Sequence, residues 1–263
     1  MNLLFIGDVV GKGGREAVRL LTPDLRREFN CQFVVINAEN SAAGSGLTSG
    51  CAKELLESAD VLTTGDHVWD QRGFDAEIDR FDRVLRPANL QKGQPGRGWN
   101  VYRNPAGGEI AIINLQGKVF MRESAYNPFE SVDEILNNEL PKSVKNIFVD
   151  FHAEATSEKL AMGYFLDGRV TAVLGTHTHV PTADAQILPG GTARQTDVGM
   201  TGAASSVLGR EVKDVLYKFT TGMPNRLAVV EKGTMRLEGA IVTYDYLTGR
   251  ASAIRPISRE INL

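Results

Sequence analysis

Short apolar runs alternate with amphipathic stretches over the first two thirds of the chain. Five runs are almost continuously hydrophobic or β-branched, and they are LLFI (3–6), FVVI (33–36), VLTT (61–64), IFV (147–149) and TAVL (171–174). Runs of this kind are typical of strands that are buried on both faces of a sheet. Between them the pattern predicts helices over residues 15–29 with a break near Pro23, 49–58, 131–140 and 157–165.

The alternation of strands and helices predicts βαβ units and a largely parallel core. Ser131 and Glu134 have the spacing of a helix capping box. From about Gly98 the pattern changes, because GWNVYR and GEIAIINL look like the two strands of a hairpin. The tail from residue 226 to 256 alternates like a β-meander, with turns at Lys232-Gly233 and Thr248-Gly249. We therefore expect an α/β fold in which two sheets form a sandwich flanked by helices.

Length and composition are those of an ordinary globular protein. The chain has 263 residues, 42% hydrophobic and 23% charged, which favours a single domain over residues 1–263. A net charge of −3 offers no electrostatic footprint for long nucleic acids. Two cysteines are too few for a disulfide framework, and no run is long enough for a secretory leader or a membrane span. These features predict cytoplasmic residence.

Candidate chemistry gathers where the five predicted strands end. The segments that follow them are Gly7-Asp8, Asn37-Ala38-Glu39-Asn40, Gly65-Asp66-His67, Asp150-Phe151-His152 and Gly175-Thr176-His177-Thr178-His179. The carboxyl ends of strands in an open α/β sheet are the usual ligand-binding edge. The chain has four histidines, and all four lie in these segments. Chance placement would scatter them, so we interpret them as functional.

Seven of these residues have side chains that ligate metals. They are Asp8, Glu39, Asn40, Asp66, His152, His177 and His179. His177 and His179 form an H-x-H pair, which an extended backbone would direct to one side, with Gly175 allowing a sharp turn beside it. Seven ligands are too many for one tetrahedral ion, whereas two ions sharing a carboxylate would use them. The mixture of imidazole, carboxylate and amide suits Mn, Fe or Zn better than Mg or Ca.

Other motifs are excluded or weak. GDVVGKGG satisfies neither the dinucleotide-binding fingerprint nor the P-loop pattern, so its glycines at 11, 13 and 14 are predicted to form a turn into the next helix. No G-x-S-x-G elbow occurs. Glu154, Ser157 and Lys159 follow His152, and they either orient that histidine or simply begin a helix.

The ordered set of motifs resembles the YmdB-like family of calcineurin-type metallophosphoesterases. The segments that carry the resemblance are LFIGDVVGKGGR, INAEN, TTGDHVWD, RPAN, INLQG, VDFHAEATSEK, GTHTHVPTAD and TDVGMTG, which run nearly end to end. The resemblance implies a four-layer αββα sandwich, a dinuclear metal centre and phosphodiesterase activity on cyclic nucleotides.

The resemblance also implies a role for each candidate residue. Asp8, Glu39, Asn40 and His179 would hold one metal ion. Glu39 would bridge to a second ion, held also by Asp66, His152 and His177. His67 would not ligate metal but would lie beside the substrate phosphate as a general acid. The implied reaction is attack of a metal-bridging hydroxide on a small phosphodiester, a 2′,3′- or 3′,5′-cyclic nucleotide.

One position departs from the family pattern. The usual third motif is Gly-Asn-His, and this chain has Gly65-Asp66-His67. With two divalent ions, three carboxylates and a hydroxide the centre would carry no net charge, whereas asparagine would leave one positive charge. Asp66 is therefore compatible with divalent ions, with a mixed-valence pair containing Fe(III), or with the alternative function of a metal-bound regulatory or scaffold protein with weak activity. The tail would also offer an edge for homo-oligomerisation.

Overall fold

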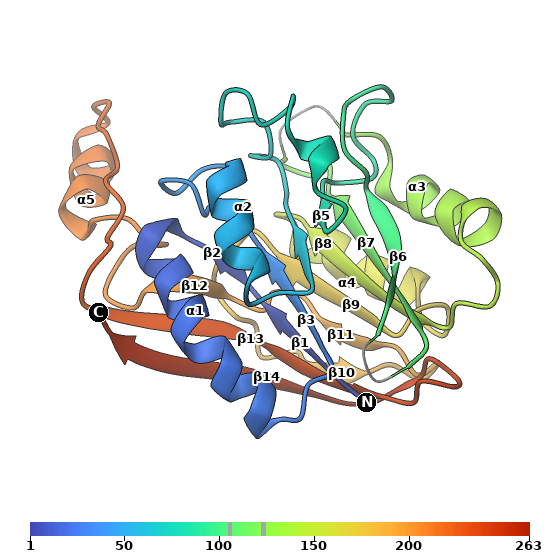
Figure 1. Cartoon of the computed structure of the whole chain (residues 1–263). Helices are drawn as coiled ribbons and strands as arrows, with labels where there is room; N and C mark the ends of the chain where they lie inside the picture. The colour runs from blue at the N-terminus through green and yellow to red at the C-terminus, as the bar shows by residue number, and fades with distance from the viewer. Residues whose placement is uncertain (105–106, 122–124) are drawn as a thin grey trace.

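The computed structural model describes residues 1–104, 107–121 and 125–263, and their elements form four layers (Figure 1). An eight-stranded mixed sheet has the order β2-β12-β13-β1-β3-β4-β5, with β14 paired to β13. Its strands are β1 (Asn2–Ile6), β2 (Asp8–Val9), β3 (Phe33–Asn37), β4 (Val61–Thr63), β5 (Val84–Leu85), β12 (Met200–Ala203), β13 (Thr234–Tyr244) and β14 (Ala251–Asn262).

A six-stranded sheet packs against the first and has the order β10-β11-β9-β8-β7-β6. Its strands are β6 (Trp99–Arg103), β7 (Glu109–Gln116), β8 (Asn146–His152), β9 (Ala172–Thr176), β10 (Gln186–Ile187) and β11 (Ala193–Gln195). The five strands predicted from the apolar runs are β1, β3, β4, β8 and β9, which are parallel to their neighbours in this set. The predicted hairpin is β6 and β7, which pair antiparallel.

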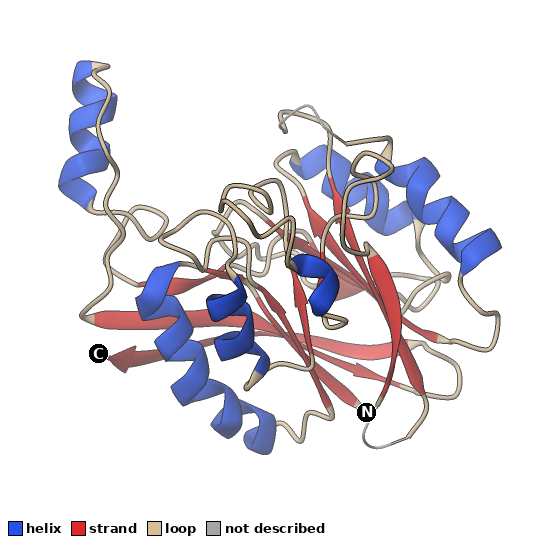
Figure 2. Ribbon diagram, turned by 45° about the horizontal axis from the view of Figure 1, so that its top comes forward, coloured by secondary structure: helices blue, strands red, loops and turns tan. Residues whose placement is uncertain are grey.

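Helices cover the outer face of each sheet, as Figure 2 shows. The helices are α1 (Gly11–Glu28), α2 (Ser49–Leu56), α3 (Pro128–Glu134), α4 (Thr156–Phe165) and α5 (Val212–Thr221), with a 3₁₀ turn at Ile78–Arg80 and a π turn at Ile135–Glu139. The first sheet buries Leu4 and Ile6 in one core with Val18 of α1. The second sheet shares another core with Met162 of α4.

A third apolar cluster joins the two sheets. Phe5 and Val35 of the first sheet pack in it with Ile112 and Phe148 of the second. Successive residues of a strand point to opposite faces, so strands that are apolar throughout fill the inner and outer cores together. The predicted αββα sandwich is confirmed.

Helix α1 differs from its prediction at its start, where glycines were expected to form a turn, and at Pro23, where a break was expected. It begins at Gly11 and runs through Pro23 without ending. Gly13 and Gly14 therefore lie inside the helix and not in a turn before it. A Cβ on Gly14 would lie 2.4 Å from the Thr201 carbonyl oxygen, so this glycine permits close packing of α1 on β12. Buried Thr22 and Leu25 flank Pro23, and their packing outweighs the lost hydrogen bond.

Helix α3 begins three residues before the predicted capping box. Its N-cap is Asn127, whose side-chain oxygen accepts a hydrogen bond from the Phe129 N–H at 3.0 Å. Pro128 occupies the first helical position, where its missing N–H has no cost. The Ser131–Glu134 box was therefore a wrong prediction, because a stronger start signal stands just before it.

The tail is a hairpin and not a three-stranded meander. β13 and β14 pair antiparallel around the predicted turn at Thr248-Gly249. The segment before Lys232-Gly233 forms only an isolated bridge between Arg210 and Val229. Helix α5 was not predicted from the sequence, and it stands away from the sheets in Figures 1 and 2.

Candidate metal centre

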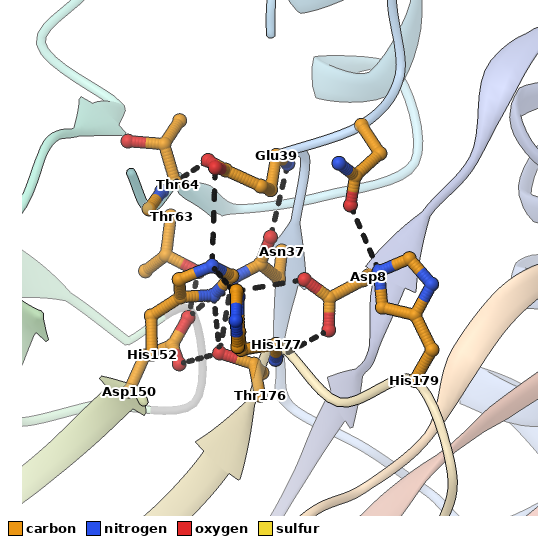
Figure 3. Close-up of polar contacts among 12 residues, drawn as sticks. Asp8, Asn37, Glu39, Thr63, Thr64, Asp150, His152, Thr176, His177 and His179 are labelled. Atoms are coloured by element: carbon orange, nitrogen blue, oxygen red, sulfur yellow. Dashed lines mark hydrogen bonds and ion pairs between the residues drawn. The ribbon is translucent and has the colours of Figure 1, made fainter. Parts of the chain in front are cut away.

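The predicted site residues come from five strand ends that meet at one edge of the sandwich. Asp8 begins β2 directly after β1, Glu39 and Asn40 follow β3, and Asp66 and His67 follow β4. From the second sheet, His152 is the last residue of β8, and His177 and His179 follow β9. Figure 3 shows Asp8, Glu39 and the three histidines of the second sheet converging on one another. The two sheets thus contribute side chains to a single cluster.

The centre of this cluster is formed by Asp66, His152 and His177. Asp66 Oδ1 lies 3.3 Å from His152 Nε2 and 3.5 Å from His177 Nδ1. The two ring nitrogens, His152 Nε2 and His177 Nδ1, lie 3.1 Å apart. One carboxylate oxygen and two imidazole nitrogens at such separations can all reach one metal ion.

Glu39 is held against the same group by backbone donors. Its two carboxylate oxygens accept hydrogen bonds from the N–H groups of Gly65 and His67. Oε1 also lies 3.8 Å from His152 Nε2. Each oxygen therefore keeps a lone pair, and Glu39 forms a second ligand group with Asp66 and His67.

Asp8, Asn40 and His179 complete the set. Asp8 is fully buried; Oδ2 accepts a hydrogen bond from the His177 N–H at 3.1 Å, and Oδ1 has no hydrogen-bond partner among the described residues. His179 Nε2 lies 3.0 Å from Asn40 Oδ1. A buried carboxylate oxygen without a donor is costly unless a cation satisfies it.

The backbone of the H-x-H pair differs from its prediction. His177 and His179 have φ values of +98° and +65°, in the left-handed region and not in an extended conformation. Such strain persists only where the surroundings hold it, and it gathers at functional sites. Gly175 is not in a turn either. It lies inside β9, and a Cβ there would lie 1.8 Å from the Thr196 carbonyl oxygen.

The direction of the pKa shifts in the cluster suits cation binding. Burial raises the pKa of Asp8 and of Glu39 well above their ordinary values, and neighbouring carboxylates add to the effect. Burial lowers the pKa of His152 to about 4 and that of His179 to about 3. His152 and His179 are therefore neutral at pH 7 and free to donate lone pairs, and divalent ions would keep the carboxylates ionised.

Asp150 was assigned no role from the sequence, and it fixes the orientation of His152. This fully buried carboxylate accepts hydrogen bonds from Asn37 Nδ2 at 2.9 Å, from Thr63 Oγ1, and from Thr176 Oγ1 at 2.7 Å. The Thr176 hydroxyl then accepts from His152 Nδ1 at 2.9 Å. Protonated Nδ1 leaves the lone pair of Nε2 facing the cluster. Its sequence signal was its place two residues before His152, on the same face of the strand.

A buried ion pair stabilises the loop that carries His177 and His179. Lys159 Nζ lies 2.8 Å from Asp197 Oδ2, and both side chains are almost fully buried. Asp197 Oδ2 also accepts hydrogen bonds from the N–H and hydroxyl of Thr178, the residue between the two histidines. Lys159 thus supports this loop and does not contact His152, whereas Glu154 Oε2 lies 3.1 Å from His177 Nε2.

His67 lies at the edge of the cluster, with one ring nitrogen engaged. Its Nδ1 lies 2.7 Å from Asp70 Oδ2 and 3.2 Å from Ser45 Oγ. The other nitrogen, Nε2, lies 4.0 Å from Asp66 Oδ2. His67 and five other predicted residues line a pocket of about 430 Å³: Glu39, Asn40, His152, His177 and His179.

The layered fold is that of calcineurin-like phosphoesterases, with a cluster of histidines and carboxylates at one edge of the sandwich. The crystal structure of the calcineurin-like phosphoesterase YfkN from Bacillus subtilis matches with a TM-score of 0.51 and 10% identity, covering 100% of this chain and 90% of that one. The sequence model of the family described as "YmdB-like protein" matches residues 4–257, and the chain belongs to this family.

Two relatives extend the comparison to activity. A 2′,3′-cyclic-nucleotide 2′-phosphodiesterase of Bacillus subtilis is 45% identical over 258 residues, covering 98% of this chain and 96% of the relative. The crystal structure of a novel phosphatase from Mycoplasma pneumoniae matches with a TM-score of 0.92 and 33% identity, covering 100% of this chain and 94% of that one. The expected class of enzyme, a phosphoesterase, is confirmed. Among the described residues, no helix has both the length and the apolar character needed to cross a membrane.

Proposed function

We propose that this chain is a dinuclear-metal phosphodiesterase that hydrolyses small phosphodiesters, with 2′,3′- or 3′,5′-cyclic nucleotides as substrates. The observation that carries the proposal is the group of Asp66, His152 and His177, whose ligand atoms lie within reach of one ion. His152 and His177 also line the pocket. The 2′,3′ isomer is favoured by the name of the Bacillus subtilis relative.

The donor set fits two transition-metal ions, Fe, Mn or Zn. Asp8, Glu39, Asn40 and His179 would hold one ion, and Glu39, Asp66, His152 and His177 the other. Two observations support this assignment. Among the described residues, Asp8 Oδ1 accepts no hydrogen bond, and His152 Nε2 lies 3.1 Å from His177 Nδ1. Because both sheets supply ligands, we also propose that residues 1–263 act as one domain.

Bound ions would polarise the phosphate and lower the pKa of an attacking water. His67 would protonate the leaving alkoxide through Nε2, since Nδ1 faces Asp70 and Ser45. Glu39 supports that placement, because its carboxylate accepts the His67 backbone N–H. The pocket has the size of a small-ligand site, which disfavours long nucleic acids as substrates.

Turnover by the metal-reconstituted protein tests the proposal. We expect hydrolysis of 2′,3′- and 3′,5′-cyclic AMP and of bis(p-nitrophenyl) phosphate, loss of activity with a chelator, and recovery with Mn, Fe or Zn. The metal content of active protein should be near two per chain. Full activity after complete metal removal would contradict the proposal.

Asp66 favours a second candidate, a metal-bound regulatory or scaffold protein. With Asp66 the proposed centre would carry no net charge, whereas asparagine would leave one positive charge to attract an anionic diester. The carboxylate also offers no N–H donor to a phosphate oxygen. We expect Asp66→Asn to keep its metal and to lower KM for cyclic nucleotides by about tenfold. Clear turnover by the unmodified chain supports the enzyme. Turnover by the asparagine variant alone would support the scaffold.

A further inference from the structure

The pocket beside the histidine cluster has two unlike walls. One is polar and includes the six predicted site residues that line the pocket. The other is apolar, and its residues are Val207, Leu208, Val215, Phe219 and Leu227. We call these five residues the apolar wall. All of them come from the segment around α5, which contributes no proposed metal ligand.

The apolar wall exposes side chains that a protein normally buries. Phe219 is 77% exposed and Leu208 is 45% exposed, although both line the pocket. An aromatic ring and an aliphatic side chain beside a polar cluster present a surface for a flat apolar group.

Leu208 occupies a turn position whose backbone conformation does not favour leucine. Val207 and Arg210 exchange two backbone hydrogen bonds around a two-residue turn, at 2.9 and 3.0 Å. Leu208 and Gly209 both have positive φ values, +52° and +82°. Turns of this kind prefer asparagine, aspartate or glycine, so a leucine here is unfavourable locally. What the leucine contributes is its side chain in the pocket.

Arg210 links the apolar wall to the loop that follows β3. Its guanidinium donates to the Gly44 carbonyl oxygen at 2.5 Å and to the Leu227 carbonyl oxygen at 3.0 Å. Gly44 lies in the loop that follows the β3 ligands, and Asn40 Nδ2 lies 3.5 Å from the same carbonyl oxygen. The two walls are therefore held at a set separation by described contacts.

We propose that the apolar wall binds the nucleobase of a nucleotide whose phosphate lies at the histidine cluster, with Phe219 as the stacking residue. The inference rests on the proposed function. A nucleotide has a charged end and a flat, weakly polar end, as the pocket does, and about 430 Å³ falls in the range of small-molecule sites. No side chain of the apolar wall can hydrogen-bond a base edge, so stacking supplies recognition and tolerates any base.

The test compares a substrate that carries a base with one that lacks it. For each variant we would measure kcat and KM with 2′,3′-cyclic AMP and with 1-O-methylribose 2,3-cyclic phosphate. We expect Phe219→Ala to lower the ratio of the two kcat/KM values about tenfold, through KM for cyclic AMP. Phe219→Trp should restore the ratio. Tyr217→Ala is the matched control, because Tyr217 is exposed on α5 but does not line the pocket.

Four outcomes would overturn the inference, and three concern kinetics: no change in the ratio, an equal loss with both substrates, or the same shift in Tyr217→Ala. A fourth is a change of oligomeric state by light scattering in Phe219→Ala, which would assign the wall to a second copy of this chain. If the unmodified chain hydrolyses no diester, the proposed function fails separately. Calorimetric binding of adenosine 2′-monophosphate and ribose 2-phosphate to the metal-loaded protein then gives the same comparison without turnover.

Discussion

Replacement of His67 by alanine is expected to lower turnover of cyclic nucleotides by about 10²- to 10⁴-fold, the usual contribution of a general acid. Metal content should stay near two per chain. The physical reason is the position of the ring, which contacts Asp70 and Ser45 through Nδ1 and leaves Nε2 for the leaving group. Steady-state kinetics with metal analysis of the same preparation measures both quantities.

His179→Ala is the matched control for this prediction. His179 contacts Asn40 at the polar wall and is proposed as a ligand. Its loss should lower both metal content and turnover, whereas His67→Ala should lower turnover alone. Loss of metal from the His67 variant would make His67 a ligand beside Glu39 and Asp66, a group that the geometry permits.

Replacement of Lys159 by methionine is expected to destabilise the metal-free protein by about 3–5 kcal/mol, the cost of removing one partner of a buried ion pair. The Asp197 carboxylate would remain buried without its countercharge, although Thr178 would still donate to it. Asp197 also faces Asp8, whose pKa is raised mainly by burial and then by this neighbouring carboxylate. Urea unfolding followed by circular dichroism measures the loss.

Two further variants separate charge from packing. Asp197→Asn in the Lys159→Met background should recover part of the loss, because the uncompensated charge is gone. Arg27→Met removes an exposed pair with Asp24 and should change the urea midpoint little. A similar midpoint for Lys159→Met and Arg27→Met would show that the buried pair contributes no more than a surface pair.

Much of the site could be predicted because its signals are local. A buried strand shows as a short apolar run, and the residue that follows the run lies at the strand end whatever the rest of the chain does. Glu39, Asp66 and His67 lie within three residues of the ends of such runs, and His152 and His177 lie at the ends of β8 and β9. Since parallel strands end at one edge, these residues meet without further information.

Errors arose where packing outweighed a local preference. Pro23 stays inside α1 because its neighbours are buried on the sheet. The same is true of His177 and His179, whose left-handed backbone no spacing rule indicates. Helix α5 was missed although Val212, Val215, Leu216 and Phe219 have the i, i+3, i+4, i+7 spacing of a helix face. Three of these residues, Val212, Leu216 and Phe219, are exposed.

The sequence by itself determined the alternation of the five central strands with helices, the sandwich, and the edge at which imidazoles and carboxylates gather. Only the tertiary structure decided which side chains hold that edge in place. Asn37 and Asp150 are 113 residues apart, yet their hydrogen bond joins the two sheets beneath the cluster. Lys159 and Asp197 are also distant in the sequence, and their buried ion pair contacts the H-x-H loop through Thr178. Hydrophobic periodicity is a property of neighbouring residues, whereas such contacts depend on the register of strands and the packing of one sheet on another.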